Sequence, residues 1–253
     1  MPSRLAAFRS KRFVRAVSGA LPILAGCNVC SGHATSFYSP RSEEKFHNCH
    51  ETEKFLKDLA QKYAHLARVI SIGKSVGDKD GKRDIWALQI NSSGQNLKDG
   101  KSGKPGIVFM GNHHAREHLS NEIPLMLAEY LLKNRQTASI QQLLSTRDIW
   151  IIPMDNPDGV EFDIRRGRHE FWRKNRRDNG DGNWGVDLNR NYSFGWRKGT
   201  NGASDETDSD VYRGPAPFSE PETQAVRHLW NTHSFVTVLN AHTYGNLLSY
   251  PWV

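Results

Sequence analysis

Residues 106–118 have the sequence GIVFMGNHHAREH, from which the type of fold can be inferred. Its four apolar residues, between two glycines, predict a short buried strand. The apolar spacing of residues 123–132 then predicts a helix. A buried strand that leads through polar residues into a helix is the building unit of an α/β domain.

The same kind of pattern recurs on both sides of this stretch. We expect strands at 68–72, 84–90, 148–153 and 235–240, and helices at 42–67 and 221–232. The signal Asn156-Pro157-Asp158-Gly159 predicts a turn that closes the strand at 148–153. Residues 165–210 are rich in Gly, Asn, Asp and Arg, and long irregular segments of this kind usually build a site. Together these features predict a single α/β domain with a mixed, mostly parallel sheet flanked by helices.

Much of the positive charge lies at the N-terminus. The formal charge of +7 falls by five to +2 without the basic leader at residues 1–26, so a nucleic-acid partner is not expected. A basic segment followed by a short apolar stretch predicts export, to the cell envelope or as a secreted protein. The alternative is a basic leader that is never cleaved. Leu24-Ala25-Gly26-Cys27 resembles the lipobox of bacterial lipoproteins, so Cys27 is a candidate lipid anchor.

The rest of the chain is expected to form one domain. Residues 27–37 are interpreted as a linker, and residues 38–253 as a monomeric catalytic domain. No apolar run reaches the 18 or so residues of a membrane span. Cys27 and Cys30 have C-x-x-C spacing, but no second pair follows to build a zinc ribbon. With Cys27 lipidated, Cys30 and Cys49 would remain to form a disulfide.

His114 and Glu117 are the first candidates for a metal site, because residues three apart in a helical turn can reach one ion. Catalytic zinc usually has three protein ligands and an open fourth position. The position of His242 favours it as the third protein ligand, because it follows the strand at 235–240. In open α/β sheets, ligands bind beyond the carboxyl ends of the strands. A lone H-x-x-E pair is common on exposed helices, so the assignment needs further support.

That support comes from six motifs that resemble those of the carboxypeptidase A/T family of metallocarboxypeptidases, in the order the family has them. They are the run from Gly111 to His118, Asn156–Gly159, Trp172–Arg176, Gly185–Tyr192, Phe218–Thr223 and His242–Tyr244. The resemblance extends from about Tyr38 to the last residue. It implies a carboxypeptidase-like fold of the phosphorylase/hydrolase-like type, Zn²⁺ as cofactor, and peptide or protein C-termini as substrate.

The resemblance implies that His114, Glu117 and His242 bind the zinc ion. It implies that Arg173 stabilises the oxyanion formed when water adds to the scissile carbonyl. Asp187 would accept the ring N–H of His114 and fix its tautomer. The chemistry agrees, because zinc acidifies its water and a guanidinium can stabilise charge that develops in the transition state.

The resemblance further implies that Asn189 and Arg190 bind the α-carboxylate of the last substrate residue. The planar guanidinium of Arg190 suits bidentate pairing with a carboxylate. Arg116 and Tyr244 would line the cleft and hold the peptide, and the Thr243–Tyr244 bond would be cis.

Some of these residues also have simpler interpretations. Taken without the resemblance, Arg173 belongs to a basic cluster that would be a solvated face, or else a patch for phosphate or an acidic polymer. Residues 178–183 predict a polar turn, with a calcium loop as the alternative. His113 and His118 are expected to be spare imidazoles at the mouth of the site rather than ligands.

The family's general base, a glutamate, lies well beyond the motif at His242–Tyr244. So do a tyrosine that caps the substrate carboxylate, the residue that sets the P1′ preference, and the last strands and closing helix. None of these is expected before Val253, and general-base catalysis contributes about 10²–10⁴-fold. The printed chain is therefore expected to bind zinc and peptide with little turnover. A fragment, a truncated gene product, an incomplete gene model and a pseudoenzyme all remain open.

The leading hypothesis is a zinc-dependent metallocarboxypeptidase that hydrolyses the C-terminal peptide bond of peptides or proteins. Two alternatives stay open. One is a related zinc amidohydrolase that acts on peptidoglycan peptides. The other is a non-catalytic, zinc-dependent peptide-binding module.

Overall fold

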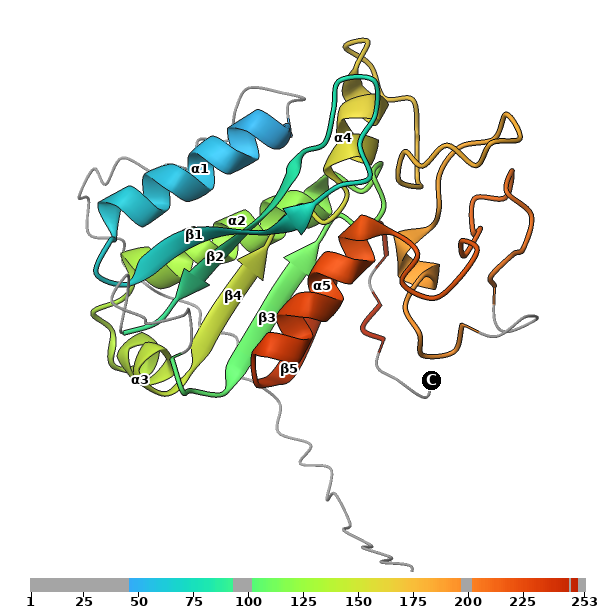
Figure 1. Cartoon of the computed structure of the whole chain (residues 1–253). Helices are drawn as coiled ribbons and strands as arrows, with labels where there is room; N and C mark the ends of the chain where they lie inside the picture. Colours follow the sequence, from blue (N-terminus) through green and yellow to red (C-terminus); the bar gives the residue numbers. More distant parts are fainter. Residues whose placement is uncertain (1–45, 93–101, 197–201, 246, 250–253) are drawn as a thin grey trace, which may run out of the picture. The chain divides into compact units, whose positions relative to one another are not determined.

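The apolar strand of the opening stretch, β3 (Gly106–Gly111), pairs in parallel with a strand on each side (Figure 1). Its neighbours are β4 (Asp148–Ile152) and β5 (Phe235–Ala241). Every residue of β4 is buried, as expected for an apolar run inside a parallel sheet. Because the three strands are parallel, the segments that follow β3 and β5 emerge at the same edge of the sheet.

Two antiparallel strands complete the sheet, in the order β1-β2-β4-β3-β5. They are β1 (Ala67–Lys74) and β2 (Asp84–Ile90), and β2 also pairs antiparallel with β4. The prediction of one mixed α/β sheet flanked by helices is confirmed. Among the described strands, parallel and antiparallel pairings are equally frequent rather than mostly parallel. One antiparallel pairing comes from the short polar connection at residues 75–83, which makes β1 and β2 a hairpin, and the other comes from the pairing of β2 with β4.

Helices cover both faces of the sheet (Figure 1). One face packs against α1 (Cys49–Lys62), α2 (Leu119–Lys133) and α3 (Ala138–Thr146), and the other packs against α5 (Pro221–Thr232). Leu59 of α1 and Leu132 of α2 are fully buried in the hydrophobic core on the face covered by α1, α2 and α3. Burial of one such side chain stabilises the fold by about 1.5–3 kcal/mol.

The structure describes residues 46–92, 102–196, 202–245 and 247–249 of a computed structural model. They belong to one compact unit that spans Phe37–Val253. The expected leader at 1–26 and linker at 27–37 lie outside the described residues, as do Cys27 and Cys30. Among the helices of the described part, none is long and apolar enough to cross a membrane.

Three local predictions differ from the structure. The first helix begins at Cys49 rather than near residue 42, because Asn48 and Glu51 form a capping box there. The predicted turn after β4 is instead the start of α4 (Pro157–Ile164), where the side chain of Asn156 accepts a hydrogen bond from the Gly159 N–H. Helix α3 was not predicted, because it is short and carries few apolar residues.

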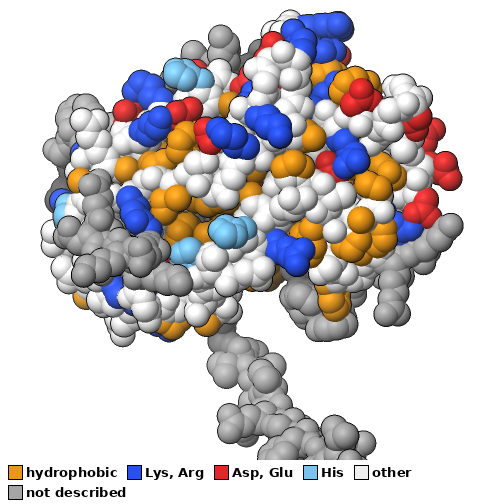
Figure 2. Space-filling model, in the orientation of Figure 1, with side chains coloured by type: hydrophobic (Ala, Val, Ile, Leu, Met, Phe, Trp, Pro, Cys, Tyr) orange, Lys and Arg blue, Asp and Glu red, His pale blue; other side chains and the backbone are white. Residues whose placement is uncertain are grey.

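Charge is mixed on the face of the molecule that Figure 2 shows, where Lys and Arg side chains alternate with Asp and Glu side chains. A nucleic-acid surface would instead gather positive charge into a patch or stripe.

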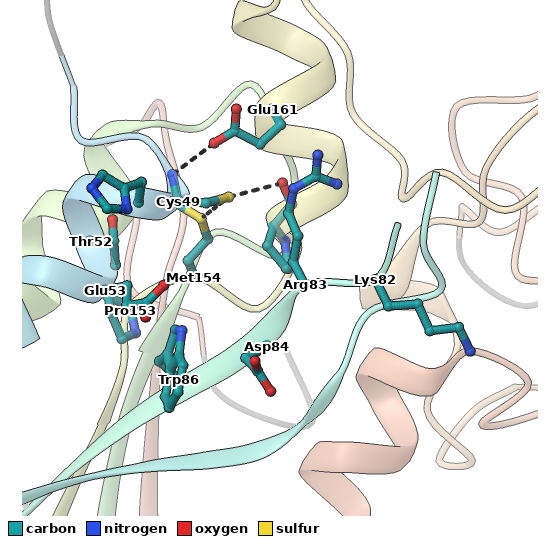
Figure 3. Close-up of a pocket in the computed structure, with 12 residues that line it drawn as sticks. Cys49, Thr52, Glu53, Lys82, Arg83, Asp84, Trp86, Pro153, Met154 and Glu161 are labelled. Atoms are coloured by element: carbon teal, nitrogen blue, oxygen red, sulfur yellow. Dashed lines mark hydrogen bonds between the residues drawn. The ribbon is translucent and has the colours of Figure 1, made fainter. Parts of the chain in front are cut away.

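Cys49 carries a free thiol, because it is not part of a disulfide in the described part of the chain. Its sulfur donates to the Pro157 carbonyl at 3.2 Å and contacts the Met154 sulfur at 3.3 Å (Figure 3). Burial raises the pKa of this thiol well above its ordinary value. The thiol borders a pocket of about 380 Å³ that none of the candidate site residues lines.

Candidate metal centre

The turn after β3 requires a close backbone approach at Gly111 and a positive φ at Asn112, which restrict the residues allowed there. A Cβ on Gly111 would lie 2.0 Å from the Ser120 carbonyl oxygen, so glycine lets β3 pass close to α2. Asn112 has a positive φ of 56°, a conformation that asparagine tolerates better than most residues. Its side-chain amide donates to the His114 carbonyl at 2.9 Å. These two residues therefore set the turn that presents His114 and Glu117.

Three side chains converge at this edge of the sheet. His114 Nδ1 lies 2.7 Å from Glu117 Oε1, and His242 Nδ1 lies 2.9 Å from Glu117 Oε2. The two histidine Nδ1 atoms are 3.2 Å apart. His242 comes directly after β5 and brings the third donor from 125 residues beyond Glu117. One carboxylate and two imidazoles form a donor set that fits Zn²⁺ with an open fourth position. These donors define the first metal cluster.

A buried carboxylate, that of Asp187, contacts the outer ring nitrogen of His114. Asp187 is fully buried, and its Oδ1 lies 3.1 Å from His114 Nε2. With the proton on Nε2, the Nδ1 of His114 is left as a lone pair that faces Glu117 and His242. Asp187 also caps the 3₁₀ helix η3 (Leu188–Arg190), where it accepts the Asn189 N–H at 3.0 Å. One side chain therefore orients a candidate metal ligand and positions the next motif.

The carboxylates of the cluster are held in their ionised form. Burial alone would raise the pKa of Glu117, but hydrogen bonding to His114 and His242 outweighs it and keeps that pKa well below the ordinary value. Burial opposes ionisation of Asp187 too, and its interactions with His114 and Arg173 lower its pKa. Both carboxylates are therefore ionised at neutral pH, as ligation or support of a cation requires.

Arg173 lies beside the ligands and is anchored to Asp187. Its Nη2 donates to Asp187 Oδ2 at 2.8 Å, and its Nη1 lies 3.9 Å from Glu117 Oε1. The backbone is held as well, because the Ala115 N–H donates to the Arg173 carbonyl at 3.0 Å. The guanidinium is thus held within 4 Å of Glu117, one of the candidate metal ligands.

Asn189 and Arg190 lie on η3, immediately after Asp187, and both are half-buried. Arg190 donates from Nε to the Gly202 carbonyl at 3.1 Å and from Nη1 to the Asn189 carbonyl at 3.0 Å. Among the described residues, no carboxylate is recorded as its ion-pair partner. The positive charge of Arg190 is held in place by neutral acceptors and remains available to an anion.

Arg116 and Tyr244 are at the periphery. Arg116 Nη1 donates to the Phe171 carbonyl at 3.2 Å and to Asp210 Oδ2 at 3.3 Å. The Tyr244 side chain is fully exposed, so it has no packing that fixes its orientation. The predicted cis bond between Thr243 and Tyr244 is confirmed. The Thr243 N–H donates to Glu117 Oε2 at 3.0 Å, which links this bond to the cluster.

The expectation that His113 and His118 lie at the mouth of the site is wrong, because both are buried. His113 Nε2 lies 2.7 Å from the Tyr192 hydroxyl. Burial and the neighbouring histidines lower the pKa of His113 to about 3, so its ring is neutral. The His118 ring instead contacts Asp163, whose Oδ2 lies 2.7 Å from His118 Nε2.

Two asparagines brace the site, and the sequence interpretation gave them no role. The Asn156 amide donates to the carbonyls of His113 and Lys174, at 3.0 and 3.1 Å. Asn175 accepts the Val186 N–H at 2.8 Å and so joins the segment of Arg173 to that of Asp187. Both lie inside the quoted motifs, which was the only signal in the sequence. Their function is tertiary, because each bridges segments that only the fold brings together.

Comparison with known proteins gives consistent results. The profile of the zinc carboxypeptidase family matches residues 52–253. Carboxypeptidase B of Astacus astacus is 34% identical over 213 residues, covering 82% of this chain and 64% of its own length. Metallocarboxypeptidase A of Trichophyton tonsurans is 33% identical over 215 residues, covering 83% of this chain and 48% of its own length. A zinc carboxypeptidase of Saccharothrix mutabilis subsp. capreolus is 37% identical over 158 residues, covering 62% and 34% respectively.

Solved structures show the same likeness. Carboxypeptidase A of Helicoverpa armigera superposes with a TM-score of 0.67 at 30% identity, over 79% of this chain and 46% of that one. Thrombin-activatable fibrinolysis inhibitor also gives a TM-score of 0.67, at 26% identity. The chain thus spans about half the length of most of the relatives it matches, between 34% and 64% of the three sequences named above.

Proposed function

Because the chain belongs to the zinc carboxypeptidase family, we propose that it forms the zinc- and C-terminus-binding part of a metallocarboxypeptidase. The observation that carries the proposal is the convergence of His114, Glu117 and His242 within hydrogen-bond distance of one another. Zinc is the ion that the family implies, and the donor set fits it. The reaction class is hydrolysis of the C-terminal peptide bond of a peptide or protein.

The roles of the other side chains follow from their positions. When bound, zinc would polarise the scissile carbonyl and acidify a water molecule. Arg173, held by Asp187, is placed to stabilise the oxyanion. Arg190 would pair with the free α-carboxylate of the substrate, and Asn189 would add a neutral donor. Arg116 and Tyr244 would contact the peptide at the rim of the site.

The general base is the part of the reaction that the described residues do not provide. Among them, no glutamate other than Glu117 is recorded in contact with the three proposed ligands. Binding and turnover are therefore separate claims. We propose zinc-dependent binding of peptide C-termini by this chain, and we expect rapid hydrolysis to require a base glutamate that is not among the described residues.

Binding can be tested with two versions of one peptide, one ending in a free carboxylate and one in an amide. Calorimetry on the zinc-loaded chain should show affinity for the free acid and little for the amide. Arg190→Ala should weaken binding of the free acid by roughly 10–100-fold, as expected for a charged hydrogen bond worth about 1.5–3 kcal/mol. Arg168→Ala is the matched control, because Arg168 is an exposed arginine of the same irregular region.

Equal affinity for the acid and the amide would contradict recognition of the C-terminus. Hydrolysis is measured in parallel by mass spectrometry of the peptide, with and without a zinc chelator. Zinc-dependent binding with little cleavage is expected both for the carboxypeptidase and for the non-catalytic peptide-binding module. A chain extended with a family C-terminal segment that carries the base glutamate separates the two, because only the carboxypeptidase should then cleave the peptide. A clear preference for peptidoglycan stem peptides over simple blocked dipeptides would favour the amidohydrolase.

Export and lipidation are proposed on the leader sequence alone. A basic segment, a short apolar stretch and the string Leu24–Cys27 support them. Expression of the full chain in a bacterium, followed by fractionation and mass spectrometry of the N-terminus, tests both. A mature protein that lacks the leader is the expected result, and a lipidated Cys27 at its N-terminus would identify the lipoprotein route. A full-length protein that keeps Met1 or Pro2 would contradict cleavage.

A further inference from the structure

A second group of two histidines and a carboxylate lies on the other side of the turn that carries Glu117. His118 Nε2 lies 2.7 Å from Asp163 Oδ2, and His169 Nδ1 lies 3.2 Å from the same oxygen. The three donor atoms lie within 4.8 Å of one another. None of the three residues has a role in the proposed carboxypeptidase site. They define the second metal cluster.

The two clusters have closely similar geometry. In the first, the rings of His114 and His242 have centroids 4.8 Å apart and an interplanar angle of 47°. In the second, the rings of His118 and His169 are also 4.8 Å apart, at 48°. In both, one carboxylate lies within hydrogen-bond distance of two imidazole nitrogens. Ring spacing and donor set therefore give no reason to regard one as a metal site and the other as a hydrogen-bonded group.

The donors of the second cluster come from three separate segments. His118 immediately precedes α2, Asp163 lies in the last turn of α4, and His169 lies in the loop that leads to Arg173. Asp163 Oδ1 accepts the Trp172 N–H at 2.6 Å, so this oxygen is occupied and Oδ2 is directed at the imidazoles. The carboxylate is fully buried and its rotamer is fixed from both ends.

The surroundings also suit a bound cation. His169 has 42% of its side chain exposed, so an ion can reach the cluster from solvent while His118 and Asp163 stay buried. Two arginines of the same loop would repel a cation, but Arg166 and Arg168 both lie 3.6 Å from Glu170. The ring of Phe46 stacks on His118 with centroids 5.4 Å apart and shields that side.

We propose that His118 Nε2, Asp163 Oδ2 and His169 Nδ1 bind a second divalent transition-metal ion of the Zn²⁺ class. Imidazole and carboxylate together suit zinc and its first-row neighbours. Three protein donors leave a fourth position for water, on the solvent side next to His169. A bound ion would tie the start of α2 and the end of α4 to the loop that precedes Arg173.

Zinc stoichiometry tests the proposal with a readout that does not depend on activity. The full chain is stripped with a chelator and titrated with Zn²⁺ against a chromophoric competitor. Bound metal is then counted by atomic emission after desalting. Wild type should bind two equivalents, His169→Ala one, Glu117→Gln one, and the double variant none. His65→Ala is the matched control, because His65 is an exposed histidine that belongs to neither cluster, and it should keep two.

A second measurement covers the case in which a variant folds poorly. In the Glu117→Gln protein, Co²⁺ bound at the second cluster should give visible d–d absorption, and Zn²⁺ should raise the unfolding temperature. Circular dichroism shows whether His169→Ala keeps its fold, and His169→Gln replaces it if it does not. One equivalent in wild type, or a second equivalent that survives both His169 substitutions, overturns the proposal.

Discussion

The two metal clusters have the same donors but different neighbours. The first, His114, Glu117 and His242, has a buried carboxylate behind one ligand and a guanidinium beside another. The second, His118, Asp163 and His169, is bordered by the ring of Phe46 and by the Trp172 backbone. Among the described residues, no guanidinium is recorded within 4 Å of Asp163.

This difference shows that a donor set alone does not determine the chemistry of a site. Metal polarisation becomes hydrolysis only where other groups stabilise the charge that develops on the substrate. The first cluster is accompanied by Arg173, Asn189 and Arg190, whose donors can bind an oxyanion and the free carboxylate of a peptide. The second cluster has packing and backbone contacts instead. We therefore expect the first to be reactive and the second to be structural.

The largest effect is expected from Glu117→Gln. Loss of a charged ligand should weaken zinc at the first cluster by more than the ~10–100-fold typical of losing a supporting partner. Any peptide hydrolysis should disappear with the metal. Competition titration measures the affinity, and the second cluster should keep its own equivalent. Loss of both equivalents would show that the clusters are coupled rather than independent.

Asp163→Asn should have the next largest effect, on stability. In chelator-treated protein the change weakens the interactions with His118 and His169, and it should lower the free energy of unfolding by about 1.5–3 kcal/mol. Urea denaturation followed by circular dichroism measures this. Asp58→Asn is the control, because Asp58 is a partly exposed residue of α1 whose loss should change stability by no more than about 0.5 kcal/mol. Equal effects of the two variants would remove the structural role assigned to Asp163.

Asp187→Asn should affect the first cluster and leave the second unchanged. The change removes the charge that orients His114 and anchors Arg173. Zinc at the first cluster should weaken by about 10–100-fold, while the second cluster is unaffected. The measurement is the competition titration in the His169→Ala background, so that only the first cluster is observed. An unchanged affinity would mean that Asp187 holds Arg173 alone.

The smallest effect is expected from Phe46→Ala. Phe46 is 41% exposed, and its ring stacks on His118 and meets His169 edge-on, with centroids 5.4 and 6.4 Å apart. Its removal should lower the free energy of unfolding by about 0.5–1.5 kcal/mol and leave the metal count at two. Urea denaturation and atomic emission measure the two quantities. Loss of the second equivalent would show that this ring is required to hold His118 in place.

Much of the fold could be predicted from local pattern. Strands β1 to β5 and helices α2 and α5 were expected near their observed positions, because apolar periodicity and turn residues act over short distances. The start of α1 and the helix after Asn156 were not, because capping hydrogen bonds decided them. The two antiparallel pairings, β1 with β2 and β2 with β4, depend on the direction in which each strand enters the sheet, which strand propensity does not reveal.

The two metal clusters likewise differ in how far local sequence could predict them. The pairing of His114 with Glu117 could be inferred from local sequence, because the two residues are three apart on one turn. The sequence also indicated His242, through motif order and its place after a strand. Only the tertiary structure decided that His118 faces Asp163 and His169, 45 and 51 residues further along. No local pattern encodes such a contact, since it exists only when α2, α4 and the following loop are packed together.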